Sequence, residues 1–281
     1  MSLVSLKAAI LKTLAYSDHF SFPLTSQEIL VRLIQEKADK VQVDAVLKDL
    51  LVRKQVMQKG EYYYVPGRAA LVEQRLKRAK VSAREITHAK LVAEKLKHVP
   101  GILGIYLTGS LAVKNSDEGD DLDLLIVTDN HRLWTTRCLL TLYCELLGLR
   151  RRPDTQAVAG KVCLNLYLTP KAFALPESKR SLYTAYELIQ VLPLSDPHGL
   201  YGNLLEANGW VHKYLPNVPF PEGATILPRF NRLGNLETLL YRFQTWYMQG
   251  KRTTEYVTHD VAFFHPANPG TSVLKKLSLD T

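Results

Sequence analysis

The amino-acid sequence predicts a mixed α/β (α+β) protein in which a small mixed sheet lies between two mainly helical regions. Strand-like and helix-like apolar patterns alternate over residues 100–175, whereas helical patterns dominate residues 1–99 and 176–281. The composition, with 46% hydrophobic and 22% charged residues over 281 positions, is that of a globular chain long enough for more than one domain. It excludes a disordered chain.

Residues 1–67 combine three short helical patterns with a hairpin pattern. The helices are expected over residues 3–16, after a cap at Thr25 or Ser26, and from about Val43. The hairpin is expected over residues 55–65, with its turn at Lys59-Gly60-Glu61 and its end at Pro66. Three helices followed by a two-stranded hairpin are typical of a winged helix-turn-helix module.

Residues 68–99 are expected to form a basic helical connector, as one long helix or two consecutive ones. The net charge of +9 is concentrated in the first hundred residues, with ten basic against seven acidic side chains in 1–70 and eight against three in 71–99. A nucleic acid is therefore a candidate partner of the winged helix and the connector. Lys48, Arg53, Lys54 and Lys59 are its candidate contacts, although Asp44 and Asp49 would repel phosphate. A protein-docking module, a rigid spacer and a solvated lysine-rich face remain alternatives.

The lengths of the apolar runs and the spacing of the cysteines indicate the cellular compartment. No run approaches the roughly 18–20 residues that a membrane span needs, and the N-terminus lacks the pattern of a signal peptide. The three cysteines, Cys138, Cys144 and Cys163, are widely spaced among leucines and form no CxxC pair. We expect free thiols, a cytoplasmic protein and no membrane partner. The sequence leaves the oligomeric state open.

The chemistry-bearing motif begins with Gly109-Ser110, after a strand expected over residues 102–107. At this point the chain turns from strand to helix. Glycine lets the backbone approach a phosphate closely, and the free amides at a helix N-terminus favour negative charge. Ser110 adds a hydroxyl donor. The pair is therefore a candidate phosphate site, with Lys114 as the first basic residue after it.

Asp121-Leu122-Asp123 follows about ten residues later and leads into a strand over residues 122–127. Strand alternation puts the two carboxylates on one face, about 7 Å apart. Two such carboxylates can share one or two Mg²⁺ (or Mn²⁺) ions, which bridge triphosphate oxygens and activate an attacking hydroxyl.

Strand, Gly-Ser, helix and Asp-x-Asp strand in this order resemble the polymerase-β-like nucleotidyltransferase superfamily, in its minimal form, over residues 100–170. The resemblance implies transfer of a nucleoside monophosphate from an NTP to an acceptor hydroxyl with Mg²⁺. Asp121 and Asp123 would be the catalytic, metal-holding residues, and Gly109 and Ser110 would hold the β- and γ-phosphates. Lys114 would contact the triphosphate, with Arg137 as an alternative.

The sequence departs from the pattern of this superfamily at one position. A third carboxylate is expected on a later strand, and the strand over residues 162–168 carries Asn165 there. An amide oxygen can be a metal ligand, but it cannot act as a base. Asn165 is thus the third metal-ligand candidate, with Glu145 and Asp154 as substitutes.

Two other groups have both a functional and a bland interpretation. Arg150-Arg151-Arg152 can contact triphosphate or a nucleic acid, or form a solvated loop. Tyr183, Tyr186 and Glu187 lie on a helix that contacts the base in many relatives, although core packing is favoured for them.

The acceptor is not readable and could be an RNA end, a protein hydroxyl or a small molecule such as an aminoglycoside. Two rival functions remain. One is a catalytically inactive nucleotidyltransferase fold that senses nucleotides or binds DNA as a regulator, which Asn165 and the winged helix favour. The other is a glycosyltransferase whose Asp-x-Asp motif binds a sugar nucleotide, which leaves Gly109-Ser110 without a role.

Overall fold

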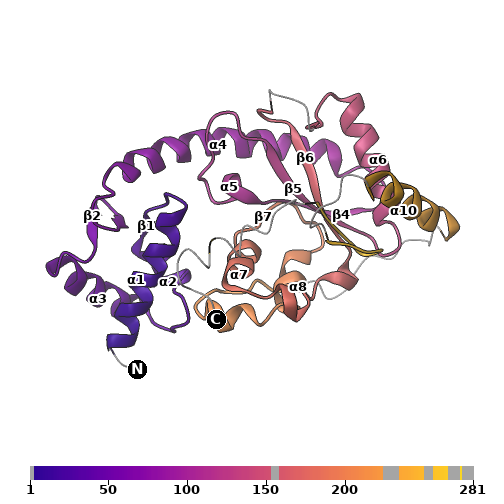
Figure 1. Ribbon diagram of the computed structural model, residues 1–281. Helices are drawn as coiled ribbons and strands as arrows, with labels where there is room; N and C mark the ends of the chain where they lie inside the picture. The colour runs from indigo at the N-terminus through magenta and orange to yellow at the C-terminus, as the bar shows by residue number, and fades with distance from the viewer. Residues whose placement is uncertain (1–2, 153–157, 224–233, 250–255, 265–272, 274–281) are drawn as a thin grey trace.

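The computed structural model describes residues 3–152, 158–223, 234–249, 256–264 and 273 (Figure 1). It contains a three-stranded sheet near the N-terminus and a six-stranded sheet in the middle of the molecule, both accompanied by helices. The mixed α/β class predicted from the sequence is confirmed.

The N-terminal module, which we define as residues 3–65, has three helices and a small antiparallel sheet. The helices are α1 (Leu3–His19), α2 (Ser26–Val31) and α3 (Lys40–Val52), and the strands are β1 (Leu24–Thr25), β2 (Met57–Lys59) and β3 (Tyr62–Tyr64) in the order β1-β3-β2.

Two helices of this module begin with capping boxes. The Thr25 hydroxyl accepts a hydrogen bond from the Glu28 amide at 3.2 Å, and the Glu28 carboxylate accepts one from the Thr25 amide at 2.8 Å. Asp39 and Gln42 form the same arrangement at the start of α3. This cap explains why α3 begins before Val43, where the apolar pattern places it.

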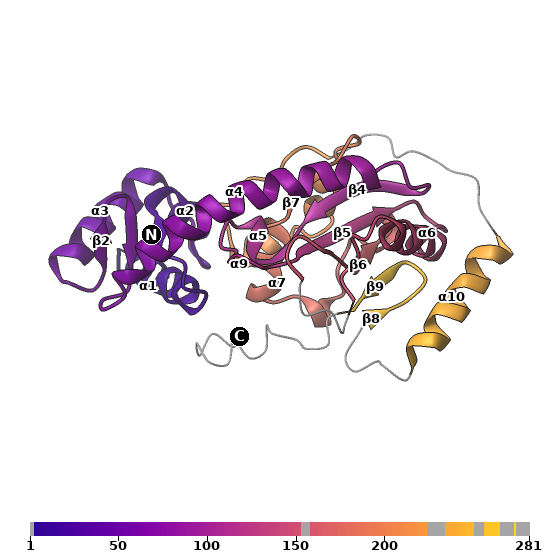
Figure 2. The same cartoon turned by 90° about the horizontal axis from the view of Figure 1, so that it is seen from above.

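The connector is a single helix, α4 (Ala70–Leu96), that runs from the N-terminal module along the larger sheet (Figure 2). Near its start, Arg75 donates to the Pro23 carbonyl and pairs with Glu28 at 2.6 Å. Near its end, buried residues such as Ala89 and Val92 pack against the sheet. The helix therefore joins the two sheets as one continuous element.

The six-stranded sheet has the order β7-β4-β5-β6-β9-β8. Its central strands are β4 (Ile102–Leu107), β5 (Leu122–Thr128) and β6 (Val162–Leu168); β5 runs antiparallel to β4 and parallel to β6. The remaining strands are β7 (Leu192–Ser195), β8 (Tyr256–Val257) and β9 (Val261–Phe263).

These last three strands lie in the region 176–281, for which mainly helical structure was predicted, and they extend the sheet beyond the predicted 100–175 core. They have two to four residues each. Such strands are too short for the period-2 signal, and β7 and β9 pair with strands far away in the sequence.

Helices cover both faces of the sheet, as strand alternation requires. Ile105, Leu124 and Ile126 pack on one side with α4 and α6 (Leu133–Leu146). Leu103, Tyr106 and Leu125 belong to the core on the other side. The helices of that second side are α7 (Leu182–Ile189), α8 (Leu200–Glu206) and α9 (Val211–Tyr214). Short 3-10 turns at Pro170–Ala172 and Glu177–Lys179 lead into α7.

Helix α10 (Asn235–Met248) lies on α6 at the end of the molecule remote from the N-terminal module (Figure 2). The Glu237 carboxylate accepts hydrogen bonds from the Trp134 amide at 2.7 Å and the Thr135 amide at 3.0 Å. This carboxylate therefore satisfies amides at the N-terminus of α6. The outer face of α10 exposes Leu239, Phe243 and Trp246.

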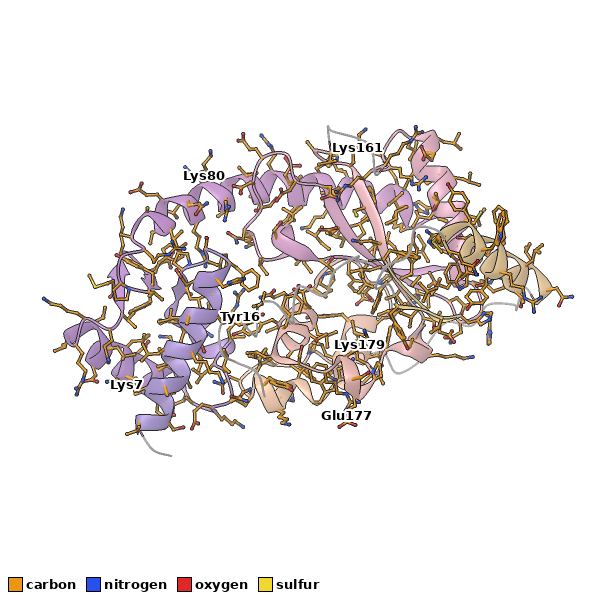
Figure 3. The ribbon with its side chains drawn as sticks, viewed as in Figure 1. Lys7, Tyr16, Lys80, Lys161, Glu177 and Lys179 are labelled. Atoms are coloured by element: carbon orange, nitrogen blue, oxygen red, sulfur yellow. The ribbon has the colours of Figure 1, made fainter. Side chains whose placement is uncertain are left out.

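The N-terminal module packs directly on α7. The Tyr16 ring stacks on the Tyr186 ring with centroids 4.2 Å apart and planes 11° apart. The Tyr186 hydroxyl donates to the Arg32 carbonyl oxygen at 2.8 Å. Figure 3 shows Tyr16 between the N-terminal helices and α7.

Two general expectations concern membranes and thiols. Within the described residues, no helix is both long and apolar enough to cross a bilayer. All three cysteines are free thiols, as expected.

Candidate functional site

The turn after β4 brings the backbone of Gly109 against Asp123. Gly109 begins the short helix α5 (Gly109–Ala112) with a φ of +69°, a conformation that side chains disfavour. A Cβ atom at this position would also lie 2.9 Å from the Asp123 Oδ2 atom. The Thr108 amide donates to the Asp123 carbonyl oxygen at 2.9 Å, which fixes the turn to the start of β5. Both the geometry and the space thus require glycine.

Asp121 and Asp123 are half-buried, while Leu122 and Leu124 between and after them are buried in the α4–α6 core. Carboxylate oxygens of both aspartates and the Cys163 Sγ atom lie within 4.8 Å of one another. The alternation predicted for this strand therefore brings the two carboxylates together.

Two residues of β6 lie at the third position of this cluster. Cys163 is the ladder partner of Asp123, and the Asn165 amide nitrogen lies 3.4 Å from the Asp123 Oδ1 atom. Burial first, and then the neighbouring aspartates, raise the pKa of Cys163 to about 12, so the thiol stays protonated. Asn165 donates to Asp123 and thereby orients it.

Sequence reasoning passed over Cys163 because cysteine among leucines suggests a buried core thiol. Its signal was the two-residue spacing from Asn165, which puts both side chains on the same face of the strand.

Ser110 is held by an acid that the motif does not include. Its hydroxyl donates to the Asp120 Oδ2 atom at 3.1 Å, and the same oxygen accepts from the Ser116 hydroxyl at 2.9 Å and the Asp117 amide at 3.1 Å. Asp120 thus organises the loop between α5 and β5. The Ser110 hydroxyl must exchange Asp120 for any phosphate that it binds.

Lys114 is exposed and has a φ of +60° on this loop. Its neighbours Val113 and Asn115 line the cavity described below, and Lys114 does not. The structure therefore does not bring the predicted triphosphate lysine to the site, because the left-handed turn lies on the outer side of the loop.

Of the three consecutive arginines, Arg151 reaches the site. Its guanidinium lies 2.6 Å from the Asp121 Oδ2 atom, whereas Arg150 and Arg152 each lie 2.7 Å from a Glu145 carboxylate oxygen. Glu145 is consequently engaged elsewhere and is not a substitute third carboxylate. Asp154 lies outside the described residues.

Arg137, the alternative triphosphate contact, is also directed elsewhere. Its guanidinium donates to the Gln244 side chain and lies 4.6 Å from the centre of the Phe264 ring. It holds α10 on α6.

A cavity of about 710 Å³ adjoins the carboxylates. Its lining includes the turn and strand end with Gly109 and Asp123, the helix α7 and the N-terminal module, together with β6, the segment 175–181, α8 and the strands β8 and β9. The lining residues from α7 include Tyr183, Tyr186 and Glu187, and those from the module include Tyr16, Phe20, Phe22 and Arg32. In Figure 1 the corresponding elements α1, α2, α5, β5 and α7 surround one region of the molecule.

Helix α7 contributes both core and cavity residues. Tyr186 is buried, as core packing predicted, whereas the Glu187 side chain lines the cavity and is exposed there. Burial is the main reason that the pKa of Glu187 is raised to about 7; Asp123 raises it further, and a hydrogen bond from Tyr183 lowers it. Glu187 is a carboxyl group near Asp123 to which sequence reasoning gave no specific role. Its signal was the four-residue spacing from Tyr183 on one helix face.

Comparison with protein-family models, with curated proteins and with solved structures finds no match for this chain.

Proposed function

We propose that this protein is a nucleotidyltransferase that moves a nucleoside monophosphate from an NTP to an acceptor hydroxyl. The observation that carries the proposal is the pair Asp121 and Asp123, whose carboxylates meet beside a glycine turn at the border of a 710 Å³ cavity. Ligand pockets commonly have about 300–1,000 Å³. The cavity is thus large enough for a nucleotide or a small acceptor.

The donor set fits Mg²⁺ through oxygen alone. Asp121 and Asp123 supply hard carboxylate oxygens, which Mg²⁺ prefers, and the protonated Cys163 thiol is a poor ligand for it. When bound there, the ion would neutralise triphosphate charge and make the acceptor hydroxyl easier to deprotonate.

The chain's own groups have separate tasks in this proposal. The backbone amides at Gly109 and Ser110 bind phosphate oxygens, because Gly109 keeps the backbone uncovered. Asn165 holds the Asp123 carboxylate in place. Arg151 balances the charge of Asp121 and offers a guanidinium to the triphosphate.

We further propose that the N-terminal module is a winged helix-turn-helix, since it has three helices and a hairpin in that order. Carboxylates neutralise two of its exposed cations: Arg53 pairs with Asp49 of the module at 2.8 Å, and Lys59 with Glu73 of the connector helix at 2.7 Å. These pairs reduce the positive charge available to a nucleic acid. They favour a structural use of the module over phosphate binding.

Thermal-shift titration tests the nucleotide site, because a ligand that binds only the native state raises its stability. We expect at least one NTP with MgCl₂ to raise the melting temperature of the wild type, and EDTA and Asp121→Asn to abolish the shift. Glu118→Gln, which removes an exposed acid from the same loop, is the matched control and should retain the shift. Absence of a shift with every NTP would refute the proposal.

Transfer is tested by incubation with each α-³²P-labelled NTP, MgCl₂ and cell extract, followed by separation of the products. We expect label on an acceptor with the wild type and none with Asp121→Asn. An NTP-dependent thermal shift without any labelled product would instead support the inactive, nucleotide-sensing regulator, which the amide of Asn165 at the third carboxylate position favours.

A further inference from the structure

Two walls of the cavity differ in chemistry, and the segment 175–181 and the strands β6, β8 and β9 also contribute to its lining. One wall carries Gly109, Asp123 and Glu187, and the proposed function uses it for phosphate and metal. The other wall belongs to the N-terminal module and carries Tyr16, Phe20, Phe22 and Arg32. Transfer chemistry at the carboxylates needs none of these four residues, so the second wall requires its own explanation.

Two arginines contact Phe22, and they differ in what satisfies them. Arg75 lies 3.9 Å from the centre of the Phe22 ring, and its guanidinium is bound by Glu28 and the Pro23 carbonyl. Arg32 lies 5.1 Å from the same ring. Within the part of the chain that the structure describes, its guanidinium has no carboxylate within 4.0 Å and no hydrogen-bond acceptor.

Arg32 therefore presents an unmatched cation to the cavity. Burial lowers the pKa of Arg32, yet a guanidinium remains charged in proteins. Arg32 is half-buried, and holding a charge partly out of water without a close carboxylate costs free energy, which a bound anion would offset. This end of the cavity is suited to a carboxylate, sulfonate or phosphate group.

The rings of the same wall are suited to a flat apolar body. Tyr16 is already stacked on Tyr186, and the Phe20 ring is tilted against Tyr16 with centroids 5.4 Å apart. Aromatic side chains bind planar molecules through offset or edge contacts in addition to the area they bury. The wall thus combines aromatic surface with one cation.

The two ends of the cavity carry opposite charges, and Tyr16 lies near both, because, in addition to burial, Glu187 raises the pKa of Tyr16 and Arg32 lowers it. Asp123 raises the pKa of Glu187, and Arg32 is not among the groups that shift it. Glu28 is the carboxylate that raises the pKa of Arg32, and neither Asp123 nor Glu187 does so. Asp123 and Glu187 repel an anionic group at their end of the cavity, whereas Arg32 attracts one at the end formed by the module. Two more cations, Lys179 and Arg180, line the cavity; both are exposed, and Arg180 donates to the Leu175 carbonyl oxygen.

We propose that the wall formed by the N-terminal module is an acceptor pocket for a small, flat, apolar molecule that carries an anionic group at Arg32 and a hydroxyl at the Asp123 end. This inference rests on the proposed function for the reaction, but not for the binding. In the reaction, the hydroxyl oxygen forms a bond to the α-phosphorus of the NTP and the α–β phosphoanhydride bond breaks. Pyrophosphate leaves, and the hydroxyl proton passes to solvent.

Binding is tested with two fluorescent probes on the full chain without metal or nucleotide. The anionic probe is 8-anilinonaphthalene-1-sulfonate and the neutral one is N-phenyl-1-naphthylamine. We expect Arg32→Gln to weaken binding of the anionic probe at least tenfold and that of the neutral probe less than twofold. Arg53→Gln, which removes an exposed arginine of α3, is the matched control and should change neither.

The exposed apolar face of α10 is unchanged in all variants, so only the difference between variants reports on the cavity. Arg32→Lys keeps the charge and should retain most of the anionic binding, which separates charge recognition from a folding defect. The inference is overturned if Arg32→Gln affects the anionic probe no more than Arg53→Gln does. It is also overturned if both probes weaken equally.

The substrate class is tested by the fate of the label in the transfer assay. A labelled product in the low-molecular-weight filtrate that is distinct from the NTP, NDP and NMP supports a small acceptor, whereas label on RNA or protein overturns it. The two proposals fail separately. Asp121→Asn should abolish the NTP-dependent thermal shift without changing binding of the anionic probe, and Arg32→Gln should do the reverse.

Discussion

The interior of the N-terminal module and the core around α7 differ in how far apart in the sequence their packed residues lie. The interior of the module is built from side chains between Leu6 and Val65. The core around α7 combines Tyr16 and Ile34 from the module with sheet residues, three helices and Val273. The first core can form when the module folds alone, whereas the second requires the whole molecule. The cavity lies in the second core, so its shape depends on how the segments meet.

Tyr16→Ala tests this difference between the two cores with the largest expected effect, because Tyr16 is a residue of α1 that belongs to the core around α7. Removing a buried aromatic ring costs about 3–5 kcal/mol. We expect hydrogen exchange to accelerate in both α1 and α7. Leu14→Ala, two residues earlier but inside the module's own core, should accelerate exchange in residues 3–65 alone. Equal patterns for the two variants would contradict the distinction.

Arg75→Ala tests how far the module depends on the connector. The change leaves Glu28 without its partner and removes the cation from the face of Phe22. We expect a loss of about 2–3 kcal/mol, less than the ~3–5 kcal/mol of a fully buried pair because Glu28 is partly exposed. Urea denaturation measures it. Lys59→Ala breaks an exposed pair with the same helix and should cost less than about 1 kcal/mol.

Thr25→Ala should have a smaller and purely local effect. It removes the hydroxyl that accepts from the Glu28 amide, and a lost N-cap costs about 1 kcal/mol. Thr25→Ser keeps the acceptor and is the control. A loss for both variants, measured by urea denaturation, would show that the methyl group of Thr25 and not its cap is responsible.

The smallest effect concerns pH and Glu187. Its folded-state pKa of about 7 lies above the ordinary 4.5, so the folded protein binds the proton more tightly than the unfolded chain does. The resulting stability is complete below pH 4.5 and is lost as the pH rises through about 7. In EDTA, Glu187→Gln should flatten this decline in the free energy of unfolding. Glu177→Gln, at the exposed position labelled in Figure 3, should leave it unchanged.

The sequence was most informative where a signal is local. Thr25 and Glu28 lie three residues apart and form the predicted capping box, and Asp121 and Asp123 meet because strand alternation requires it. The helical connector follows from the periodicity up to Pro100, and the structure has it as one helix, the first of the two forms that the sequence allowed. Each of these features is determined by neighbours along the chain.

The remaining parts of the site depend on contacts between distant segments. Cys163 joins the aspartates through strand pairing, Glu187 faces Asp123 from another helix, and Arg32 reaches the cavity from the N-terminal module. None of the three has a local pattern that distinguishes it from an ordinary core or surface residue. Lys114 shows the opposite case. It is close to Gly109 in the sequence, but it occupies a left-handed turn and does not line the cavity.

The stacked pair Tyr16 and Tyr186 has one more consequence. These two rings come from opposite sides of the junction between the module and the rest of the molecule, and both line the cavity. A molecule that fills the cavity therefore bridges that junction, and by thermodynamic linkage its binding must strengthen the attachment of the module by the same free energy with which attachment strengthens binding. Occupancy and domain docking are then a single coupled equilibrium.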